Sequence, residues 1–309
     1  MSSPPPPGVY VPAVLFFDEA EELDVVAIKA HTLRLAQGGV TGILVQGSNG
    51  EAQHLSHEER KATISLTRAT LDENGFQNVL IIAGTGGQST RETRKLCVDA
   101  KEAGASHALV LTPGVWPNQM NKDRILKFHR DVADASPIPT MIYNFPVVTA
   151  GLNLDSDIIA ALAVHPNIVG TKLSCADVGK LNRLTSSLSP EKFATFPGSS
   201  SVFLQGLVVG SAGIIGALPN VAPKAHLHLY KLFKEGKMAE AQKLQGLLAH
   251  ADWELQKLGS IAGIKAVVSK HFGYGSTDVR GPLTPQNLEA VDAAAITKLE
   301  ELIALEKTL

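Results

Sequence analysis

The chain has 309 residues, of which 44% are hydrophobic and 19% are charged, and its formal net charge at pH 7 is −2. These values describe an ordinary globular protein with enough length for a large core, and they exclude nucleic-acid binding through a strongly basic surface. No segment has the uninterrupted run of apolar residues that a membrane span needs, so we expect no membrane partner.

Cysteine use and the N-terminus bear on the compartment. Cys97 and Cys175 are the only cysteines. Two cysteines are too few for a disulfide framework and these are too far apart for a zinc motif, so we expect a reducing compartment. Residues 1–8 contain four consecutive prolines and lack both an apolar signal core and the arginines of a transit peptide. We predict a disordered lead-in at residues 1–8 and a cytoplasmic protein.

From residue 11 onward, short β-rich runs alternate with longer helical patterns. The predicted strands are 11–17, 41–46, 79–83, 107–111, 139–143, 167–172, 193–196 and 212–215. The predicted helices between them are 24–38, 56–73, 89–103, 121–134, 155–164, 176–188 and 200–209. Ser56 and Glu59 have the spacing of a capping box, while Gly75 and Gly104 follow two predicted helix ends.

Strands that each precede a helix favour a parallel α/β fold, and this number of repeats predicts a (β/α)8 TIM barrel. A dinucleotide-binding fold is disfavoured because no G-x-G-x-x-G motif follows the first strand. Residues 84–87 are glycine-rich but lack that spacing and a Walker lysine, so we do not interpret them as a phosphate-binding loop.

The chain beyond Pro219 is predicted to be wholly helical, with helices at 220–235, 237–258, 260–272 and 284–306. The first of these would complete the barrel, which we place at residues 9–235. The remainder, residues 236–309, would be a C-terminal helical extension too small to be more than an appendage. Its apolar stripe, which includes Leu244 and Leu248, predicts core or subunit contacts.

Lys172 ends the apolar run of the sixth predicted strand. Because side chains alternate along a strand, Ile168, Gly170 and Lys172 share one face. A strand of a parallel barrel is buried, and an amine buried there must be paired or lose its charge. A neutral lysine amine is what carbonyl chemistry through a Schiff base requires. The alternative is a lysine at a strand end that reaches solvent with its charged tip.

Two further polar groups follow predicted strands at the end of a barrel where active sites form. The turn at residues 47–51 (GSNGE) follows the second strand, and its backbone N–H groups could bind a carboxylate. An ordinary connecting turn is the alternative, and Glu51 is assigned a structural role. Tyr143 ends the fifth strand, one repeat before Lys172; such a tyrosine is either a half-buried core residue or a proton carrier.

Together these residues resemble the dihydrodipicolinate synthase / N-acetylneuraminate lyase superfamily of class I aldolases. The resemblance rests on residues 47–51 (GSNGE), 143–146 (YNFP) and 170–172 (GTK), and it extends from about residue 9 to about residue 285. It implies that Lys172 forms an imine with the keto carbon of pyruvate or another 2-oxo acid. Tyr143 would donate and accept protons, and no metal or other cofactor would be needed.

The resemblance also implies the substrate-binding residues. Ser48 would belong to the proton relay with Tyr143. Ser48, Asn49 and the amide of Gly50 would hold the substrate carboxylate, and Ile215 would approach the same pocket through its backbone. A homotetramer is expected from the resemblance.

Two departures from the family pattern bear on the substrate. Many members have a tyrosine that reaches a neighbouring subunit after the fourth strand, where this chain has Val115 and Trp116. Dihydrodipicolinate synthases also have an arginine for the second substrate's carboxylate, where this chain has Val147 and Val148. We therefore expect an aldolase that cleaves a 2-keto-3-deoxy sugar acid, such as L-threo-3-deoxy-hexulosonate, to pyruvate and an aldehyde. The segment at residues 165–170 favours eukaryotic, particularly fungal, members.

Several alternatives stay open at this point. The substrate could be 4-hydroxy-2-oxoglutarate, which would yield pyruvate and glyoxylate. The same imine could serve a synthase, such as dihydrodipicolinate synthase, or a dehydratase. A scaffold protein without turnover is disfavoured because Lys172, Tyr143 and Ser48 are all present. His54, His107 and Ser199 could add polar contacts to the substrate, but the sequence does not place them.

Overall fold

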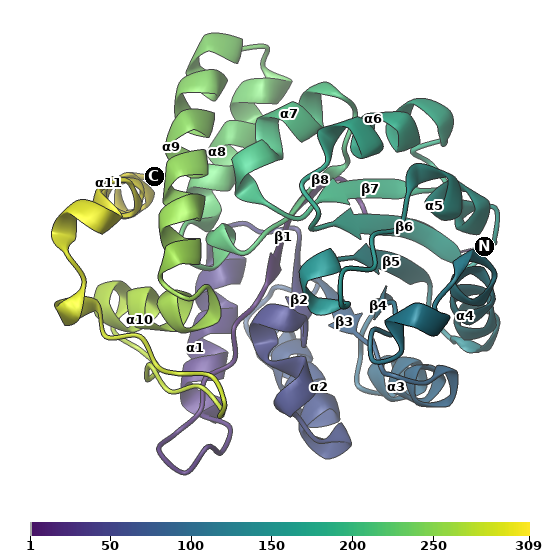
Figure 1. Cartoon of the computed structure of the whole chain (residues 1–309). Coiled ribbons are helices and arrows are strands. Elements are labelled where there is room, and N and C mark those ends of the chain that lie inside the picture. Colours follow the sequence, from purple (N-terminus) through teal and green to yellow (C-terminus); the bar gives the residue numbers. More distant parts are fainter. Residues whose placement is uncertain (1) are drawn as a thin grey trace.

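The computed structural model describes residues 2–309, and its centre is a barrel of parallel β-strands (Figure 1). The strands are β1 (Gly8–Pro12), β2 (Gly42–Val45), β3 (Leu80–Gly84), β4 (His107–Leu111), β5 (Thr140–Asn144), β6 (Ile168–Leu173), β7 (Ala194–Pro197) and β8 (Gly213–Ile215). Their order is β7-β6-β5-β4-β3-β2-β1-β8. Beside β8, the Ala212 N–H donates to the Thr195 carbonyl of β7 at 3.0 Å, which brings the two ends of the sheet together. The predicted (β/α)8 barrel is confirmed.

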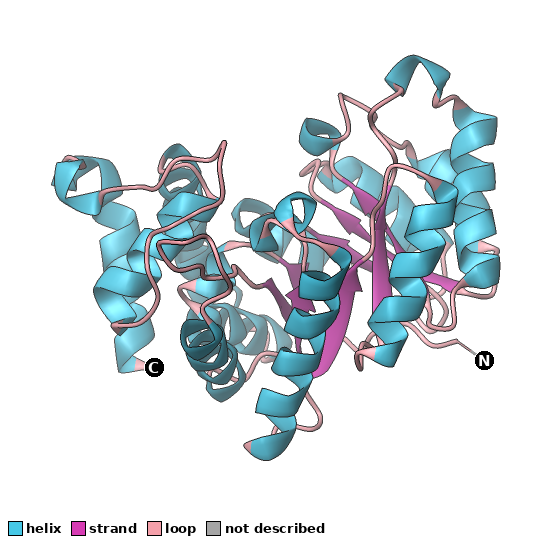
Figure 2. Ribbon diagram, turned by 90° about the horizontal axis from the view of Figure 1, so that it is seen from below, coloured by secondary structure: helices cyan, strands magenta, loops and turns pink. Residues whose placement is uncertain are grey.

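Helices surround the strands, as Figure 2 shows from below. They are α1 (Val25–Gln37), α2 (His57–Glu73), α3 (Thr90–Glu102), α4 (Lys122–Ala135), α5 (Ser156–Ala163), α6 (Val178–Ser187), α7 (Phe203–Val208) and α8 (Pro223–Lys234). The predicted capping box is present: Ser56 Oγ accepts from the Glu59 N–H, and the Glu59 carboxylate accepts from the Ser56 N–H. Side chains at the first turn therefore fix where this helix begins.

The barrel interior is filled by a cluster of mostly apolar side chains from every strand. Its buried members are Tyr10, Leu44, Ile82, Leu109, Met141, Tyr143, Val169, Ala194, Phe196 and Ile215. Tyr10 and Phe196 meet edge to face, with ring centroids 5.4 Å apart. Because the interior is a packed core, the space available to a substrate lies above it, at the carboxyl ends of the strands.

The prediction of a first strand at residues 11–17 is wrong, because β1 is Gly8–Pro12. The apolar residues that follow are buried in a loop. Phe16 packs edge to face against His31 of α1, and Phe17 lies beneath the cationic groups of Lys265 and Arg280. An apolar run records burial, and here side chains of other elements provide it in place of sheet pairing.

The predicted disorder of residues 1–8 does not describe residues 2–8, and residue 1 lies outside the described residues. Gly8 already belongs to β1. Tyr10 Oη donates to the Pro6 carbonyl at 2.7 Å, and His107 Nε2 lies 3.0 Å from the Ser3 carbonyl oxygen. An extended proline-rich segment has no internal hydrogen bonds, so its carbonyls can accept from the amino-terminal end of the barrel.

The C-terminal extension contains α9 (Met238–Lys257), α10 (Ile261–Phe272) and α11 (Thr297–Thr308). One apolar cluster joins Leu229 of α8, Leu248 of α9 and Leu302 of α11, so barrel and extension share a core. The chain between α10 and α11 runs past α1 (Figure 1). Within residues 2–309, no helix is both long enough and apolar enough to cross a membrane.

The prediction of one helix at residues 284–306 is wrong. Two short 3₁₀ helices, Leu288–Ala290 and Ala293–Ile296, precede α11. Asn287 and Asp292 side chains accept hydrogen bonds from backbone N–H groups two residues onward. These local bonds compete with α-helical bonding and delay the helix.

Candidate active site

A cavity of about 290 Å³ opens at the carboxyl ends of the strands on one side of the barrel. The loop after β2 supplies Gln46, Gly47, Ser48, Glu51, Ala52, Gln53 and His54 to its lining. The remaining lining residues are Gly84, Gly86, Gln88, Leu109, Leu111, Tyr143, Val148, Ile261 and Leu283. No arginine or lysine of the described chain lines this cavity, and Lys172 adjoins it only through its neighbour Tyr143. Its floor is apolar, and its polar groups come mainly from neutral side chains.

Lys172 and Tyr143 lie side by side, as their spacing predicts. They are register partners on β6 and β5, and each is 4% exposed. Lys172 Nζ is 4.5 Å from the centroid of the Tyr143 ring, and Tyr143 lines the cavity. Within residues 2–309, the Lys172 amine has neither an acidic partner nor a hydrogen bond. The amine instead faces the ring of Tyr143.

The surroundings of Tyr143 hold its ring in place. The ring stacks on Phe145, with the centroids 5.6 Å apart. Ser174 Oγ donates to Tyr143 Oη at 3.4 Å, a long hydrogen bond. Sequence reasoning assigned the hydroxyl partner to Ser48, which lines the same cavity without a hydrogen bond to Tyr143 in the described chain. Ser174 was missed, although it follows Lys172 by two positions and comes directly after the last residue of β6.

The turn after β2 is a 3₁₀ helix, Ser48–Gly50. The Gly50 N–H donates to the Gly47 carbonyl at 3.0 Å, so the amide predicted to bind substrate is already used. Ser48 and Asn49 are the first residues of this 3₁₀ helix. Backbone N–H groups at the start of a helix have no partner within it. Asn49 Nδ2 is buried and has no hydrogen-bond partner among the described residues. Donors that could take an anion therefore gather on Ser48 and Asn49.

Gly84 allows this turn to approach the barrel closely. A Cβ at residue 84 would lie 1.9 Å from the Gln46 carbonyl oxygen. Only glycine leaves room for that contact. Ile215, the remaining predicted binding residue, is fully buried in the interior cluster and, like Asn49 and Gly50, does not line the cavity. Its role stays a prediction.

The three polar residues that the sequence did not place, His54, His107 and Ser199, lie in different parts of the structure. His54 lines the cavity. His107 begins β4 at the opposite end of the barrel, and Ser199 donates to Asp252 of α9 at 2.7 Å. Val148 lines the cavity where an arginine would stand in dihydrodipicolinate synthases.

Sequence reasoning missed Gln88, which lines the cavity. Its Oε1 accepts from the N–H groups of Gly114 and Val115, at 3.1 and 3.2 Å, and so holds the loop after β4. The glycine-rich stretch before it was the available signal, since it allows the chain to pass close to a ligand. Ile261 and Leu283 were missed because they lie in the C-terminal extension, far from the barrel strands in sequence.

A family model described as "Dihydrodipicolinate synthetase family" matches residues 5–299. The chain belongs to this family. Its 295 or so matched positions include every barrel strand and most of the extension. The predicted family and the predicted fold are therefore confirmed.

Fungal members of the family are similar over nearly the whole chain. A protein of Emericella nidulans named "Probable 4-hydroxy-2-oxoglutarate aldolase, mitochondrial" is 46% identical, covering 98% of this chain and 97% of its own length. The "L-threo-3-deoxy-hexylosonate aldolase" of Aspergillus niger is 40% identical, covering 98% of this chain and 97% of its own length. Both relatives are named aldolases, in agreement with the predicted class of carbon–carbon lyase.

Among solved structures, a dihydrodipicolinate synthase family protein from Coccidioides immitis is 36% identical with a TM-score of 0.86, covering 99% of this chain and 98% of its own. The family protein YagE of E. coli, solved with pyruvate, is 27% identical with a TM-score of 0.85, covering 98% of each chain.

The predicted cytoplasmic location is contradicted. The relatives from Emericella nidulans and Coccidioides immitis, at 46% and 41% identity, are both named mitochondrial. Few cysteines indicate a reducing compartment, and that property does not distinguish the cytosol from the mitochondrial matrix. Composition of a folded domain therefore could not decide the location.

Proposed function

We propose that this protein is a class I aldolase that cleaves a 2-keto-3-deoxy sugar acid into pyruvate and a hydroxyaldehyde. One observation carries the proposal: the amine of Lys172, a buried residue with no ion pair or hydrogen bond in the described chain, lies over the ring of Tyr143, beside a cavity lined mainly by neutral groups. Such an amine is suited to attack a keto carbon. The reaction belongs to the breakdown of carbohydrate acids.

Lys172 begins the reaction by attacking C2 of the substrate to give a carbinolamine. Tyr143 transfers a proton to the departing hydroxyl, and loss of water leaves a protonated imine. Tyr143 then accepts the proton of the C4 hydroxyl. The C3–C4 bond breaks, its electron pair moves into the imine to form an enamine, and the C4 fragment leaves as an aldehyde. Protonation of the enamine at C3 and hydrolysis release pyruvate and restore Lys172.

Ser48 and Asn49 are the proposed binding site for the substrate's own carboxylate. Three kinds of donor have no hydrogen-bond partner in the described chain: the Ser48 hydroxyl, the first N–H groups of the 3₁₀ helix and Asn49 Nδ2. Charge-assisted hydrogen bonds from such donors orient a 2-oxo acid with its keto carbon toward the barrel centre. Ser48 also remains the proposed relay for the Tyr143 proton.

The neutral lining favours a hydroxylated tail over a second carboxylate. Gln53, His54 and Gln88 offer hydrogen bonds to hydroxyl groups, while no arginine or lysine among residues 2–309 lines the cavity. A second carboxylate would be buried there without a cationic partner, which is costly. The alternative substrate, 4-hydroxy-2-oxoglutarate, is supported by the name of the 46% identical relative. A dihydrodipicolinate synthase is disfavoured because Val147 and Val148 replace its carboxylate anchor.

We also propose a homotetramer. Trp116, Val115 and Val147 are 68%, 56% and 83% exposed near the ends of β4 and β5, and contact with another copy would cover them. Sedimentation analysis that gave only monomers at micromolar concentration would contradict this proposal.

Borohydride trapping tests the proposed reaction. In the presence of pyruvate, borohydride delivers hydride to the imine carbon and fixes the substrate on the lysine as a secondary amine. We expect the adduct on Lys172, and none in Lys172→Ala. A panel of 2-oxo acids with pyruvate detection then ranks sugar acids against 4-hydroxy-2-oxoglutarate. A product that retains the complete carbon skeleton would indicate a dehydratase instead.

A further inference from the structure

Glu51 ends the turn that carries Ser48 and Asn49. Its N–H donates to the Ser48 carbonyl at 3.1 Å, which closes the 3₁₀ helix. Its backbone lies in the left-handed region, with φ of 51° and ψ of 37°. A residue with a side chain as large as glutamate adopts this conformation only where its surroundings hold it.

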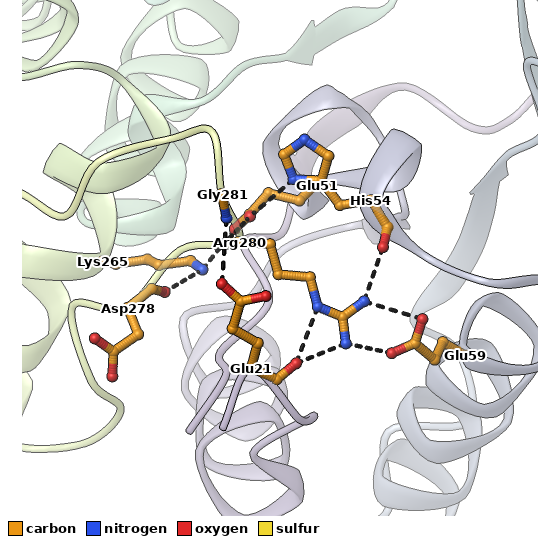
Figure 3. Close-up of polar contacts among 8 residues, drawn as sticks. All are labelled: Glu21, Glu51, His54, Glu59, Lys265, Asp278, Arg280 and Gly281. Carbon is orange, nitrogen blue, oxygen red and sulfur yellow. Dashed lines mark hydrogen bonds and ion pairs between the residues drawn. The ribbon is translucent and has the colours of Figure 1, made fainter. Parts of the chain in front are cut away.

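The Glu51 carboxylate is held by the C-terminal extension. Its Oε1 accepts from Lys265 Nζ at 2.6 Å, and its Oε2 accepts from the Arg280 N–H at 2.9 Å (Figure 3). The side chains of Glu51 and Lys265 are both 0% exposed. A buried ion pair of this kind requires hydrogen bonds to its remaining polar atoms, and here both carboxylate oxygens are used.

Lys265 joins three parts of the chain at one amine. It stands on α10, it donates to the Asp278 carbonyl at 2.7 Å, and it pairs with Glu51. Its Nζ also lies 4.5 Å from the centroid of the Phe17 ring, in the loop after β1. The amine therefore fixes the distance between the extension and the turn after β2.

Arg280 fastens the next part of the extension to the same region. Its guanidinium donates to the Glu21 carbonyl at 2.7 and 2.9 Å and to the His54 carbonyl at 2.8 Å, and it pairs with the Glu59 carboxylate (Figure 3). His54 and Glu59 follow Glu51 along the chain. The guanidinium thus holds the C-terminal part of the segment that carries Ser48 in its N-terminal part.

Two apolar residues of the extension also line the cavity, one before Lys265 and one after Arg280 in the sequence. Ile261 begins α10, and Leu283 follows Arg280 by three positions; both line the cavity. The extension therefore contacts the site in two ways. Lys265 and Arg280 bind Glu51 of the turn. Ile261 and Leu283 form part of the cavity wall.

We propose that Glu51 is a positioning residue and that Lys265 and Arg280 make the C-terminal extension a working part of the substrate-carboxylate site. Held from behind, Glu51 fixes the turn so that the donors of Ser48 and Asn49 are oriented before the substrate arrives. This inference rests on the proposed function, because the ligand of the turn there is the carboxylate of a 2-oxo acid.

The test compares two ketones that differ by a carboxylate. Pyruvate and acetone are each trapped on Lys172 with borohydride, and the concentration for half-maximal trapping is measured in the wild-type protein and in Glu51→Gln. We expect this concentration to rise about tenfold for pyruvate, which corresponds to one lost charge-assisted contact, and to stay unchanged for acetone. A purely structural role would move both values together.

Glu306→Gln is the matched control. Glu306 is another buried carboxylate, 4% exposed, which accepts from the N–H groups of Lys224 and Ala225 at 3.1 and 2.9 Å and does not line the cavity. Its variant should trap both ketones as the wild type does. The double variant Glu51→Gln with Lys265→Met removes both charges of the buried pair and repeats the measurement without an unpaired ammonium.

The outcomes separate the two proposals. A rise limited to pyruvate in the Glu51 variants supports the inference. Equal changes for both ketones, or no change, would overturn it while leaving the aldolase proposal intact. Failure of the wild-type protein to form a pyruvate adduct on Lys172 would overturn the proposed function and the inference with it.

Discussion

Lys172 and Lys265 are two buried lysines with opposite surroundings. Their side chains belong to residues that are 4% and 0% exposed, and each amine lies 4.5 Å from the centroid of an aromatic ring. Lys265 has the Glu51 carboxylate and the Asp278 carbonyl as partners, at 2.6 and 2.7 Å. Lys172 has no such partner in the described chain.

This difference shows that burial alone does not identify a reactive lysine. Burial lowers the pKa of the Lys265 amine, and the Glu51 carboxylate opposes that change by stabilising the ammonium form. The Lys265 side chain therefore has a structural role. Lys172 makes no comparable bond, stands beside a cavity, and is free to bond to a carbon atom.

The largest expected effect is on activity. Lys172→Ala should lower the rate of pyruvate release by at least about 10⁴-fold, because the nucleophile is gone and no covalent intermediate forms. Its free energy of unfolding should change little, since no ion pair is lost. Steady-state assays and urea unfolding measure the two quantities. Activity within tenfold of the wild type would contradict the assignment of Lys172 as nucleophile.

Removal of the partner of Lys265 should have its largest effect on stability. Glu51→Gln leaves a buried ammonium without its counter-ion and should lower the free energy of unfolding by about 3–5 kcal/mol. The double variant Glu51→Gln with Lys265→Met should recover part of this loss. Urea unfolding of Glu51→Gln, of Lys265→Met and of the double variant gives the coupling energy, and a coupling near zero would show that the pair does not stabilise the fold.

The tyrosine beside the Lys172 amine should give a smaller effect on activity. Tyr143→Phe keeps the ring face and removes the hydroxyl, so it should slow pyruvate release by about 100-fold through loss of proton transfer. Tyr10→Phe is the control, because the Tyr10 hydroxyl donates to the Pro6 carbonyl at the other end of the barrel. Equal activity of the two variants would remove Tyr143 from the proposed proton path.

Buried histidines give the smallest predicted effect, a dependence of stability on pH. Burial lowers the pKa of His129 to about 3 and that of His226 to about 4. Between these values and the ordinary pKa of about 6.5, the unfolded chain binds more protons than the folded chain, so stability falls as the pH falls.

The expected slope for each histidine is about 1.4 kcal/mol per pH unit within that window. His226→Gln should reduce the slope of the free energy of unfolding between pH 6 and 4, as denaturant titrations at several pH values would show. An unchanged slope would mean that His226 does not remain neutral in the folded chain.

The sequence was sufficient to predict that Tyr143 and Lys172 lie side by side. Alternation along a strand and one βα repeat between Tyr143 and Lys172 placed them together, and β5 and β6 pair these residues in register. Start signals such as the Ser56 capping box likewise predicted where helices begin. These features depend on local spacing, which a sequence displays directly.

The sequence did not reveal the buried pair of Glu51 and Lys265, which are separated by 214 positions. No periodicity connects them, and a lysine within an apolar helix has no local signal that names its partner. The same limit applies to Leu283, whose place at the cavity depends on the path of the extension. The helix predicted at residues 284–306 failed because side chains of Asn287 and Asp292 bond to nearby backbone.

The central claim is that the unpaired buried lysine is the reactive one. Borohydride reduction in the presence of pyruvate, followed by digestion and mass spectrometry of the peptides, tests it directly. We expect the pyruvate adduct on Lys172 and an unmodified Lys265. An adduct on Lys265 or on another lysine, or no adduct at all, would contradict it.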